Sequence, residues 1–293
     1  MHGWIVIDKP VGPGSARIVG AVKRALREGG YPKAKIGHGG TLDPLASGVL
    51  PIAIGEATKL AGRMLGADKA YEFTIRFGAE TDTLDAEGAV VAMSDRRPTL
   101  AEIEAALPRF TGAIAQVPPA YSALKVAGKR AYARARAGEE VALNNRDVTI
   151  HALSVVAGGP DGVTLSARVS KGTYIRSLAR DLARALASVG HVTMLRRTKA
   201  GPFTLERAIS LDKLGEAAKG RTLEKYLLPL TAGLDDIPAL PVTPDQAGAL
   251  RQGRKLIGIA AQPGLHLATD QDVPVALVEL SGGELRVLRG FNL

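Results

Sequence analysis

The sequence predicts an α+β fold followed by a small, β-rich C-terminal domain. Three observations support this prediction. Strand and helix patterns occur together, but without the regular strand–helix repeat of a parallel α/β fold. Glycine- and proline-containing turns join neighbouring strands as hairpins, for example at 158–162. The composition changes after Leu228, and strand patterns dominate the remaining residues.

Local patterns place the first elements. Trp4–Ile7 is a short apolar run that precedes a loop rich in proline and glycine, so it predicts a strand. Ser15 is expected to cap a helix that continues to about Glu28. Tyr71–Phe77 alternates large apolar side chains with polar ones, which is typical of a strand with one buried face.

The other elements follow from the same rules. Thr99 and Glu102 have the spacing of a capping box. The expected strands of the main body are Val49–Ile54, Val148–Val156, Val163–Val169 and His191–Arg197, and its expected helices are Glu56–Leu65, Thr99–Leu107 and Tyr174–Val189. After a linker at Thr231–Pro241, the expected elements are a helix at Gln246–Arg251 and strands at Val273–Leu280 and Glu284–Leu288.

Composition excludes several kinds of site. The 293 residues contain no cysteine, which rules out disulfides, zinc ribbons and cysteine nucleophiles. No two of the five histidines stand at metal-ligand spacing on one helix, so we expect no metal. Neither a signal peptide nor an apolar run of membrane-spanning length is present, so we expect a cytoplasmic protein without a membrane partner.

The charge favours a polyanionic partner. The formal net charge is +9, and basic side chains gather at 121–146 and 168–199. Lysine and arginine bind nucleic acid by displacing counterions from phosphates. The alternative is an ordinary solvated basic surface.

The loop around Asp43 is the first candidate for chemistry. Gly37, Gly39 and Gly40 allow the backbone to approach a ligand closely, and Asp43 stands before Pro44, which holds it extended. A carboxylate fixed in this way can act as a nucleophile or base. The alternative is an aspartate that only caps a turn.

Three further segments carry candidate residues. Ser170–Arg176 lies between a strand and a helix, where backbone N–H groups favour anions and Arg176 could pair with a carboxylate or phosphate. The alternative is a solvated basic helix start. Tyr71 could stack on an extruded base, or belong to the core like Phe73. Pro118–Lys125 could grip RNA, or form a structural loop.

Two other segments, 12–14 and 81–85, bear on cofactor and metal binding. Gly12-Pro13-Gly14 lacks the third glycine of a dinucleotide fingerprint, and no Walker sequence is present. We therefore expect no nucleotide cofactor. The segment 81–85 is expected to form a hydrogen-bonded turn rather than a calcium loop.

Taken in order, these segments resemble the TruB family of bacterial tRNA pseudouridine synthases, which act on uridine 55 in the T-loop. The resemblance spans about residues 3–210, although Gly39 stands where the family often has threonine or alanine. The matching segments are Asp8–Pro10, Gly37–Pro51, Gly55–Lys59, Asp68–Gly78, Thr81–Gly88, Tyr121–Lys125, Lys171–Arg176 and Leu195–Thr198.

The resemblance implies a mixed, largely antiparallel central sheet with flanking helices and a cleft between two halves. It implies that Asp43 is catalytic, that Arg176 is its partner and that Tyr71 lies against the flipped uracil. It also implies a set of substrate-binding residues: His38, Lys171, Tyr174 and Leu195.

The implied organisation is a catalytic domain at 1–232, with an RNA-contacting insertion at about 111–147, and a PUA-like RNA-binding domain at 239–293. The expected partner is the T-arm of tRNA. The expected protein is a monomer that requires no cofactor and no protein partner.

Other readings stay open at this point. The nearest is a guide-dependent or ribosomal-RNA pseudouridine synthase of the same superfamily, although a start only a few residues before Trp4 favours the stand-alone tRNA enzyme. A second is an RNA-folding chaperone. A third is an N-glycosidase, which would release free uracil.

Overall fold

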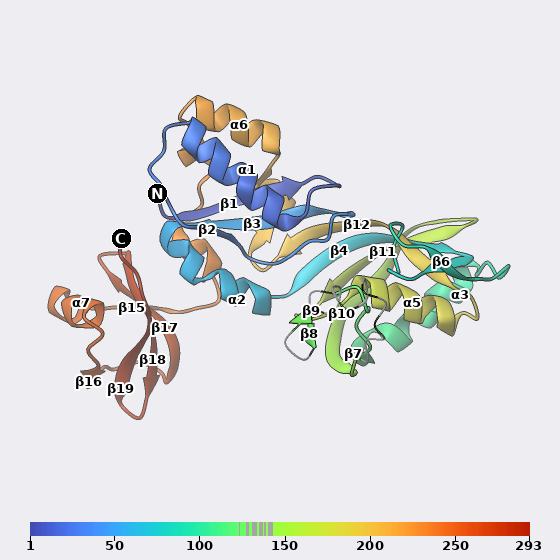
Figure 1. The fold of residues 1–293 in the computed structure, drawn as a ribbon. Coiled ribbons are helices and arrows are strands. Elements are labelled where there is room, and N and C mark those ends of the chain that lie inside the picture. The colour runs from blue at the N-terminus through green and yellow to red at the C-terminus, as the bar shows by residue number, and fades with distance from the viewer. Residues whose placement is uncertain (123, 127–128, 131–133, 135–136, 138, 140–142) are drawn as a thin grey trace.

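A long mixed sheet forms the body of the molecule (Figure 1). The computed structural model describes residues 1–122, 124–126, 129–130, 134, 137, 139 and 143–293. The sheet has the strand order β14-β1-β3-β12-β4-β11-β10-β7, with β2 paired to β3 and β13 paired to β12. Only the β1–β14 and β12–β3 pairs are parallel among the strand pairs described in this sheet. The predicted α+β class, with a mixed and largely antiparallel sheet, is therefore confirmed.

The strands of this sheet come from most of the chain. They are β1 (Gly3–Lys9), β2 (Ile36–His38), β3 (Ala46–Ile54), β4 (Lys69–Phe77), β7 (Gly112–Gln116), β10 (Arg146–Gly159), β11 (Gly162–Val169), β12 (Gly190–Ala200), β13 (Phe203–Thr204) and β14 (Ala208–Ile209). Short hairpins are formed by β5 (Ala79–Thr81) with β6 (Val90–Met93), and by β8 (Lys125–Val126) with β9 (Lys129–Arg130).

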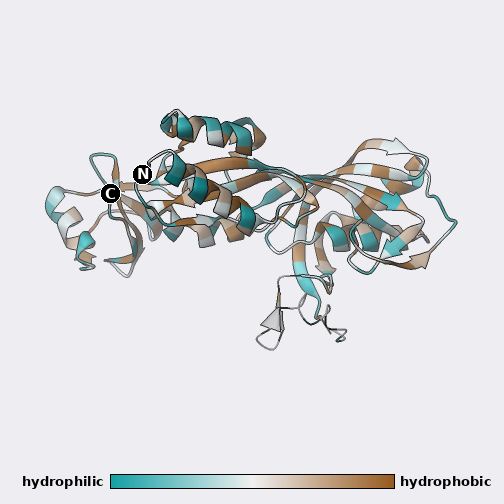
Figure 2. Ribbon diagram, turned by 45° about the horizontal axis from the view of Figure 1, so that its top comes forward, coloured by the Kyte–Doolittle hydropathy of each residue, from teal (hydrophilic) through white to brown (hydrophobic). Residues whose placement is uncertain are grey.

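Helices cover the two halves of the sheet separately. Figure 1 shows α1 (Ser15–Glu28) beside α6 (Leu211–Lys219) at one half, and α5 (Ile175–Ala185) with α3 (Leu100–Ala106) at the other. The short α2 (Ala61–Gly66) leads into β4. Figure 2 shows hydrophobic residues concentrated in the strands, while much of the helices' surface is hydrophilic. The long strands β4 and β12 run through both halves and join them into one framework.

A separate five-stranded sheet forms the C-terminal part. Its order is β15 (Ala239–Pro241), β17 (Gly264–Asp270), β18 (Val273–Ser281), β19 (Glu284–Gly290) and β16 (Leu256–Ile257), and α7 (Pro244–Arg251) packs against it. Phe291, Leu267 and Leu277 join the apolar cluster around Trp4, and Lys59 Nζ donates to the Gly290 carbonyl at 2.9 Å. The sheet confirms a β-rich C-terminal part; the predicted boundaries at 232 and 239 and the PUA-like assignment stay predictions.

Most predicted elements are present, and the differences have local causes. The expected helix Glu56–Leu65 is a 3-10 segment, Gly55–Lys59, followed by α2, because the buried Leu60 forms a corner between them. The expected helix Tyr174–Val189 ends at Ala185, two residues before Ala187 adopts a positive φ of 54°.

Two other expectations change. The linker predicted at 231–241 ends in β15, which is paired parallel to β17. Strand β7 belongs to the main sheet, so the first residues of the predicted insertion at 111–147 are part of the framework. Residues 123, 127–128, 131–133, 135–136, 138 and 140–142 of the predicted insertion lie outside the described residues.

Candidate active site

Asp43 lies on the loop between β2 and β3, which is here called the Asp43 loop (residues 39–45). Backbone hydrogen bonds hold its ends: Gly39 N donates to the Pro51 carbonyl at 2.9 Å, and Ala46 N donates to the Asp43 carbonyl at 3.1 Å. A Cβ added to Gly39 would lie 2.9 Å from the Cβ of Met64. A larger side chain at Gly39 would therefore require Met64 to move.

The Ser15 side chain joins the Asp43 loop rather than capping α1. Gly14 occupies the N-cap position, and no side chain caps that helix end. Ser15 Oγ instead accepts from Leu42 N at 2.8 Å and donates to the Leu42 carbonyl at 3.0 Å. The predicted cap was wrong because the buried peptide before Asp43 offers Ser15 two partners. The first helix is thereby tied to the candidate catalytic loop.

Arg176, in the first turn of α5, meets Asp43 directly. Its Nη2 lies 2.8 Å from Asp43 Oδ2 and also donates to the Tyr121 carbonyl at 3.0 Å. The Arg176 side chain is 8% exposed, whereas that of Asp43 is 44% exposed. One side of the carboxylate is therefore fixed by a buried cation, while the other remains open to a ligand.

Asp85 is a third member of this cluster that the sequence did not single out. Its Oδ2 lies 3.3 Å from Arg176 Nη1, and its side chain is only 5% exposed. Thr83 Oγ1 and Glu87 N donate to its other oxygen at 2.6 and 3.1 Å. The segment 81–85 is thus the expected hydrogen-bonded turn, and it also supplies a buried second carboxylate to Arg176.

The strand register brings Tyr71 and Leu195 to the same region. Leu195 on β12 pairs with Ala46, the first residue of β3 after the Asp43 loop. Tyr71 on β4 is half-buried and pairs with Arg197, two residues farther along β12. Tyr71 packs at the margin of the core, so the alternation predicted a strand correctly, and its side chain is still partly accessible.

Tyr174 stands immediately before α5. Gln116 clamps its backbone, since Oε1 accepts from Tyr174 N at 2.8 Å and Nε2 donates to the Tyr174 carbonyl at 3.1 Å. Burial is the main cause that raises the pKa of the Tyr174 phenol; the charge of Asp43 raises it too, whereas the charges of Arg146 and Arg176 lower it. This phenol and the Asp43 carboxylate are therefore electrostatic neighbours, and the phenol keeps its proton at neutral pH.

His38 and Lys171 lie at opposite ends of this arrangement. His38 closes β2, and its Nδ1 accepts from Gly40 N at 3.4 Å. Burial lowers the pKa of the His38 imidazole, and the charge of Arg197 lowers it further. Lys171 is exposed and lines a hollow of about 540 Å³ together with Arg146 and Leu65, near the start of α5.

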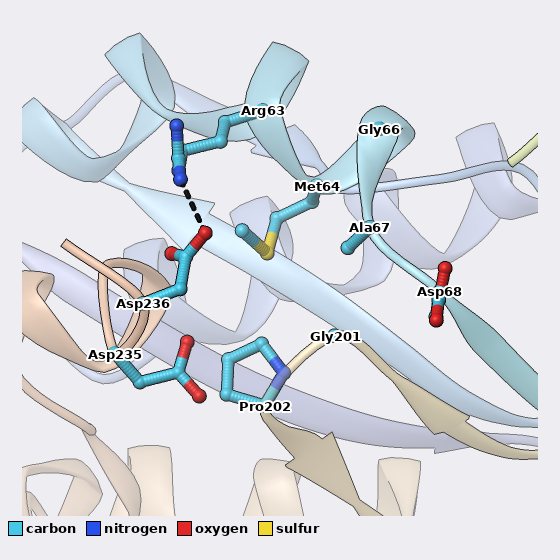
Figure 3. A pocket seen from close by; sticks show the side chains of 9 residues that line it. All are labelled: Arg63, Met64, Gly66, Ala67, Asp68, Gly201, Pro202, Asp235 and Asp236. Atoms are coloured by element: carbon cyan, nitrogen blue, oxygen red, sulfur yellow. Dashed lines mark hydrogen bonds and ion pairs between the residues drawn. The ribbon is translucent and has the colours of Figure 1, made fainter. Parts of the chain in front are cut away.

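A second hollow contains none of these residues. It has a volume of about 510 Å³ and lies between α2 and the segment that leads to the C-terminal sheet (Figure 3). Arg63 and Asp236 form an ion pair of 2.6 Å there. Within the described part of the chain, no group of three histidine, aspartate or glutamate side chains is arranged to hold a metal ion. No helix among the described residues is long and apolar enough to cross a membrane.

Fold and site together define a class of protein. A solved Cbf5–Nop10–Gar1 complex contains a chain 26% identical to this one, with a TM-score of 0.76, covering 99% of this chain and 85% of that one. A solved H/ACA RNP bound to a substrate RNA containing 2′-deoxyuridine gives a TM-score of 0.74 at 25% identity, over 99% and 85% of the two chains. The class is the pseudouridine synthase fold, and in this chain Asp43 lies on a loop of that fold and pairs with Arg176.

The family follows from the sequence relatives. Residues 27–175 match the model of the TruB family pseudouridylate synthase N-terminal domain, and residues 176–235 match the tRNA pseudouridylate synthase B C-terminal domain. Proteins named tRNA pseudouridine synthase B from Zymomonas mobilis and Novosphingobium aromaticivorans are each 63% identical over 100% of this chain and 96% and 98% of theirs. The chain belongs to the TruB family of pseudouridine synthases.

Proposed function

We propose that this chain isomerises uridine 55 in the T-loop of tRNA to pseudouridine, acting without a guide RNA. The names of its relatives support tRNA as the substrate, since proteins named tRNA pseudouridine synthase B are 63% identical over the full chain. The single observation that carries the proposal is the 2.8 Å pair between the half-exposed Asp43 and the buried Arg176. It supplies an ionised carboxylate on an accessible loop.

The isomerisation requires one charged carboxylate, which the pair of Asp43 and Arg176 would supply. The N1–C1′ bond of uridine breaks, the uracil turns, and C5 bonds to C1′ while the proton on C5 is lost and N1 gains one. Nothing is oxidised and no group is supplied from outside, so one carboxylate can serve as nucleophile or base. Asp43 would attack C1′, attack C6 or remove a ribose proton, and each route needs its charged form.

The other site residues are assigned by position. Flipping the uridine costs a few kcal/mol, and stacking on Tyr71 would return about 1–3 kcal/mol. Tyr174 and Leu195 would form the wall of the uracil pocket. His38 would meet the tRNA where the base leaves its stack, and Lys171 would contact a phosphate.

The proposal also covers the division of the chain into domains. Residues 1–232 would form the catalytic domain, with the segment at about 111–147 contacting RNA, and residues 239–293 would form a PUA-like domain that binds tRNA. The protein would act in the cytoplasm as a monomer. A guide-dependent or ribosomal-RNA activity is less well supported, because the guide-type structural neighbours share only about a quarter of their residues with this chain. An additional RNA-folding role would use the same RNA-binding residues.

The deciding experiment treats an isolated T-arm RNA, without guide RNA, with the wild-type chain and with Asp43→Asn. We expect pseudouridine at position 55 with the wild type and no detectable product with the variant. RNA affinity should stay within about threefold, since an amide fills the space of the carboxylate.

The matched control is Asp235→Asn, an exposed aspartate in the second hollow, which should retain full activity. Turnover by Asp43→Asn would refute the role of Asp43. Release of free uracil by the wild type would indicate an N-glycosidase.

A further inference from the structure

Arg197 is a buried cation that contacts carbonyl groups rather than carboxylates. It lies on β12 and is 1% exposed. None of the ion pairs found within the described residues includes Arg197. Its Nε donates to the Val49 carbonyl at 2.8 Å, Nη1 to the Thr41 carbonyl at 3.3 Å and Nη2 to the Gly40 carbonyl at 3.2 Å. A buried charge is costly unless hydrogen bonds compensate it, so these three contacts account for its place in the fold.

Two of those carbonyls belong to the Asp43 loop. Gly40 and Thr41 precede Asp43 by three and two positions, and Val49 anchors the same guanidinium to β3. Gly40 also donates its N–H to His38 Nδ1. A single planar group therefore fixes the peptide that connects His38 with Asp43.

The other side of Asp43 is held by a different buried cation. Lys9 Nζ donates to the Pro44 carbonyl at 3.3 Å and to the Ala46 carbonyl at 2.5 Å. With Ser15 bonded to Leu42, backbone groups on both sides of Asp43 are held by side chains from other elements. Arg197 ties the residues before Asp43 to β3, and Lys9 ties the residues after Asp43 to the start of β3.

The backbone around Arg197 is shaped to allow this contact. Gly40 has a φ of 140°, and a Cβ on it would lie 3.6 Å from Arg197 Nη1. A Cβ on Gly48, which has a φ of 101°, would lie 2.2 Å from the Arg197 carbonyl oxygen. Gly40, in the Asp43 loop, and Gly48, in β3, thus have conformations that other residues rarely adopt, and these conformations allow both glycines to lie against Arg197 on β12.

We propose that Arg197 is a positioning residue for the isomerisation: its guanidinium fixes Gly40 and Thr41 so that His38 and Asp43 meet the RNA in one geometry. This inference rests on the proposed function. Lysine cannot replace the group, because an ammonium lacks the planar fork that reaches three carbonyls in different directions. Arg197 touches no reacting atom in this proposal, so its loss should lower the rate constant of the chemical step more than the RNA affinity.

The test is Arg197→Lys in the full chain, assayed on T-arm RNA under single-turnover conditions. Misplacing a catalytic group by about 1 Å can cost on the order of 10²-fold in rate, and we expect a loss of that order. The dissociation constant for RNA should change by less than about threefold. The matched control is Arg184→Lys, because Arg184 pairs with the largely buried Glu80 in another part of the fold; its rate should stay within about twofold.

A second readout does not depend on activity. The ring-nitrogen NMR signal of His38, assigned with His38→Gln, reports the bond from Gly40 N to Nδ1. We expect it to shift in Arg197→Lys and not in Arg184→Lys. An inactive wild type with the expected NMR shift would refute the proposed function, while still showing that Arg197 fixes the peptide between His38 and Asp43.

A folded Arg197→Lys with wild-type rate and an unmoved His38 signal would overturn the positioning role. If Arg197→Lys does not fold, Gly40→Ala provides the same test, since a methyl group at this φ displaces the carbonyl that Arg197 binds. The same rate loss and the same His38 shift are then expected, and a wild-type result for both would overturn the inference.

Discussion

The two buried arginines on either side of the Asp43 loop satisfy their charge in opposite ways. Arg176 faces two carboxylates, Asp43 at 2.8 Å and Asp85 at 3.3 Å. Arg197 donates to three backbone carbonyls and forms no ion pair within the described residues. The first arginine is coupled to the charge of the candidate catalytic group, and the second is coupled to the position of its backbone.

This difference separates two requirements of the site. A nearby positive charge favours the charged form of a carboxylate, and a buried charge needs its own compensation. Arg176 meets both requirements: it places a positive charge beside Asp43, and the buried Asp85, on the turn 81–88, compensates its own charge. Arg197 differs, because backbone carbonyls compensate its charge and it has no carboxylate partner among the described residues; its hydrogen bonds fix the position of those carbonyls.

The largest expected effect comes from removing the charge of Arg176. Arg176→Met leaves Asp85 buried without its cation, and breaking such a pair typically costs about 3–5 kcal/mol. It also removes a charged donor from the catalytic carboxylate, which we expect to lower the single-turnover rate by on the order of 10³-fold. Urea unfolding and T-arm assays would measure the two effects. A folded variant with a rate near that of the wild type would end the functional distinction between the two arginines.

A smaller effect is expected at Asp85. Asp85→Asn keeps an oxygen for Thr83 Oγ1 and Glu87 N but loses the negative charge beside Arg176 Nη1. Arg176 would then interact more strongly with Asp43, which weakens Asp43 as a nucleophile or base. We expect a rate loss of about tenfold, with RNA binding retained. Asp82→Asn, on the same turn, is the control, and equal losses in both variants would assign the effect to the turn instead of to the charge.

The sequence predicted the framework better than the contacts within it. Alternation at Tyr71–Phe77 and the capping box at Thr99 depend on neighbouring residues, and both were confirmed. The bounds of α2 and α5 depend on corners at Leu60 and Ala187, which local patterns do not distinguish from a continuing helix.

The site was predictable only where a family motif carried it. Asp43 and Arg176 stand 133 positions apart, and no local pattern joins them. The resemblance proposed their pairing, and the structure shows their contact. Local patterns predict only a turn at Asp85, because its contact with Arg176 depends on where α5 begins. Ser15 and Arg197 act on backbone carbonyls, which every residue carries, so the sequence gives no sign of their partners.

The buried Lys69 sharpens the comparison, because unlike an arginine it can lose its proton. Lys69 Nζ donates to the carbonyls of Met64, Leu65 and Ala67 at 2.9, 3.0 and 2.5 Å. Burial lowers the pKa of Lys69 to about 8, and the charge of Arg197 adds to that effect. The three carbonyl contacts of Lys69 therefore do not fully compensate its buried charge.

The consequence is a pH dependence of stability with a definite sign. Between pH 8 and about 10.5 the unfolded chain holds a proton on Lys69 that the folded chain has released, so the free energy of unfolding rises with pH in this window. Below pH 8 both states are protonated, and the folded state bears the full cost of the buried charge. The lowered pKa corresponds to about 3 kcal/mol over the whole window.

The measurement is urea unfolding at several pH values from 7 to 10.5, for the wild type, Lys69→Met and the exposed Lys219→Met. Lys69→Met loses three hydrogen bonds at every pH, but it also lacks the titrating group. The stability of the wild type relative to Lys69→Met should therefore rise by up to about 3 kcal/mol across the window, while its difference from Lys219→Met should not rise. A constant difference between the wild type and Lys69→Met would mean that the three carbonyls compensate the Lys69 charge fully.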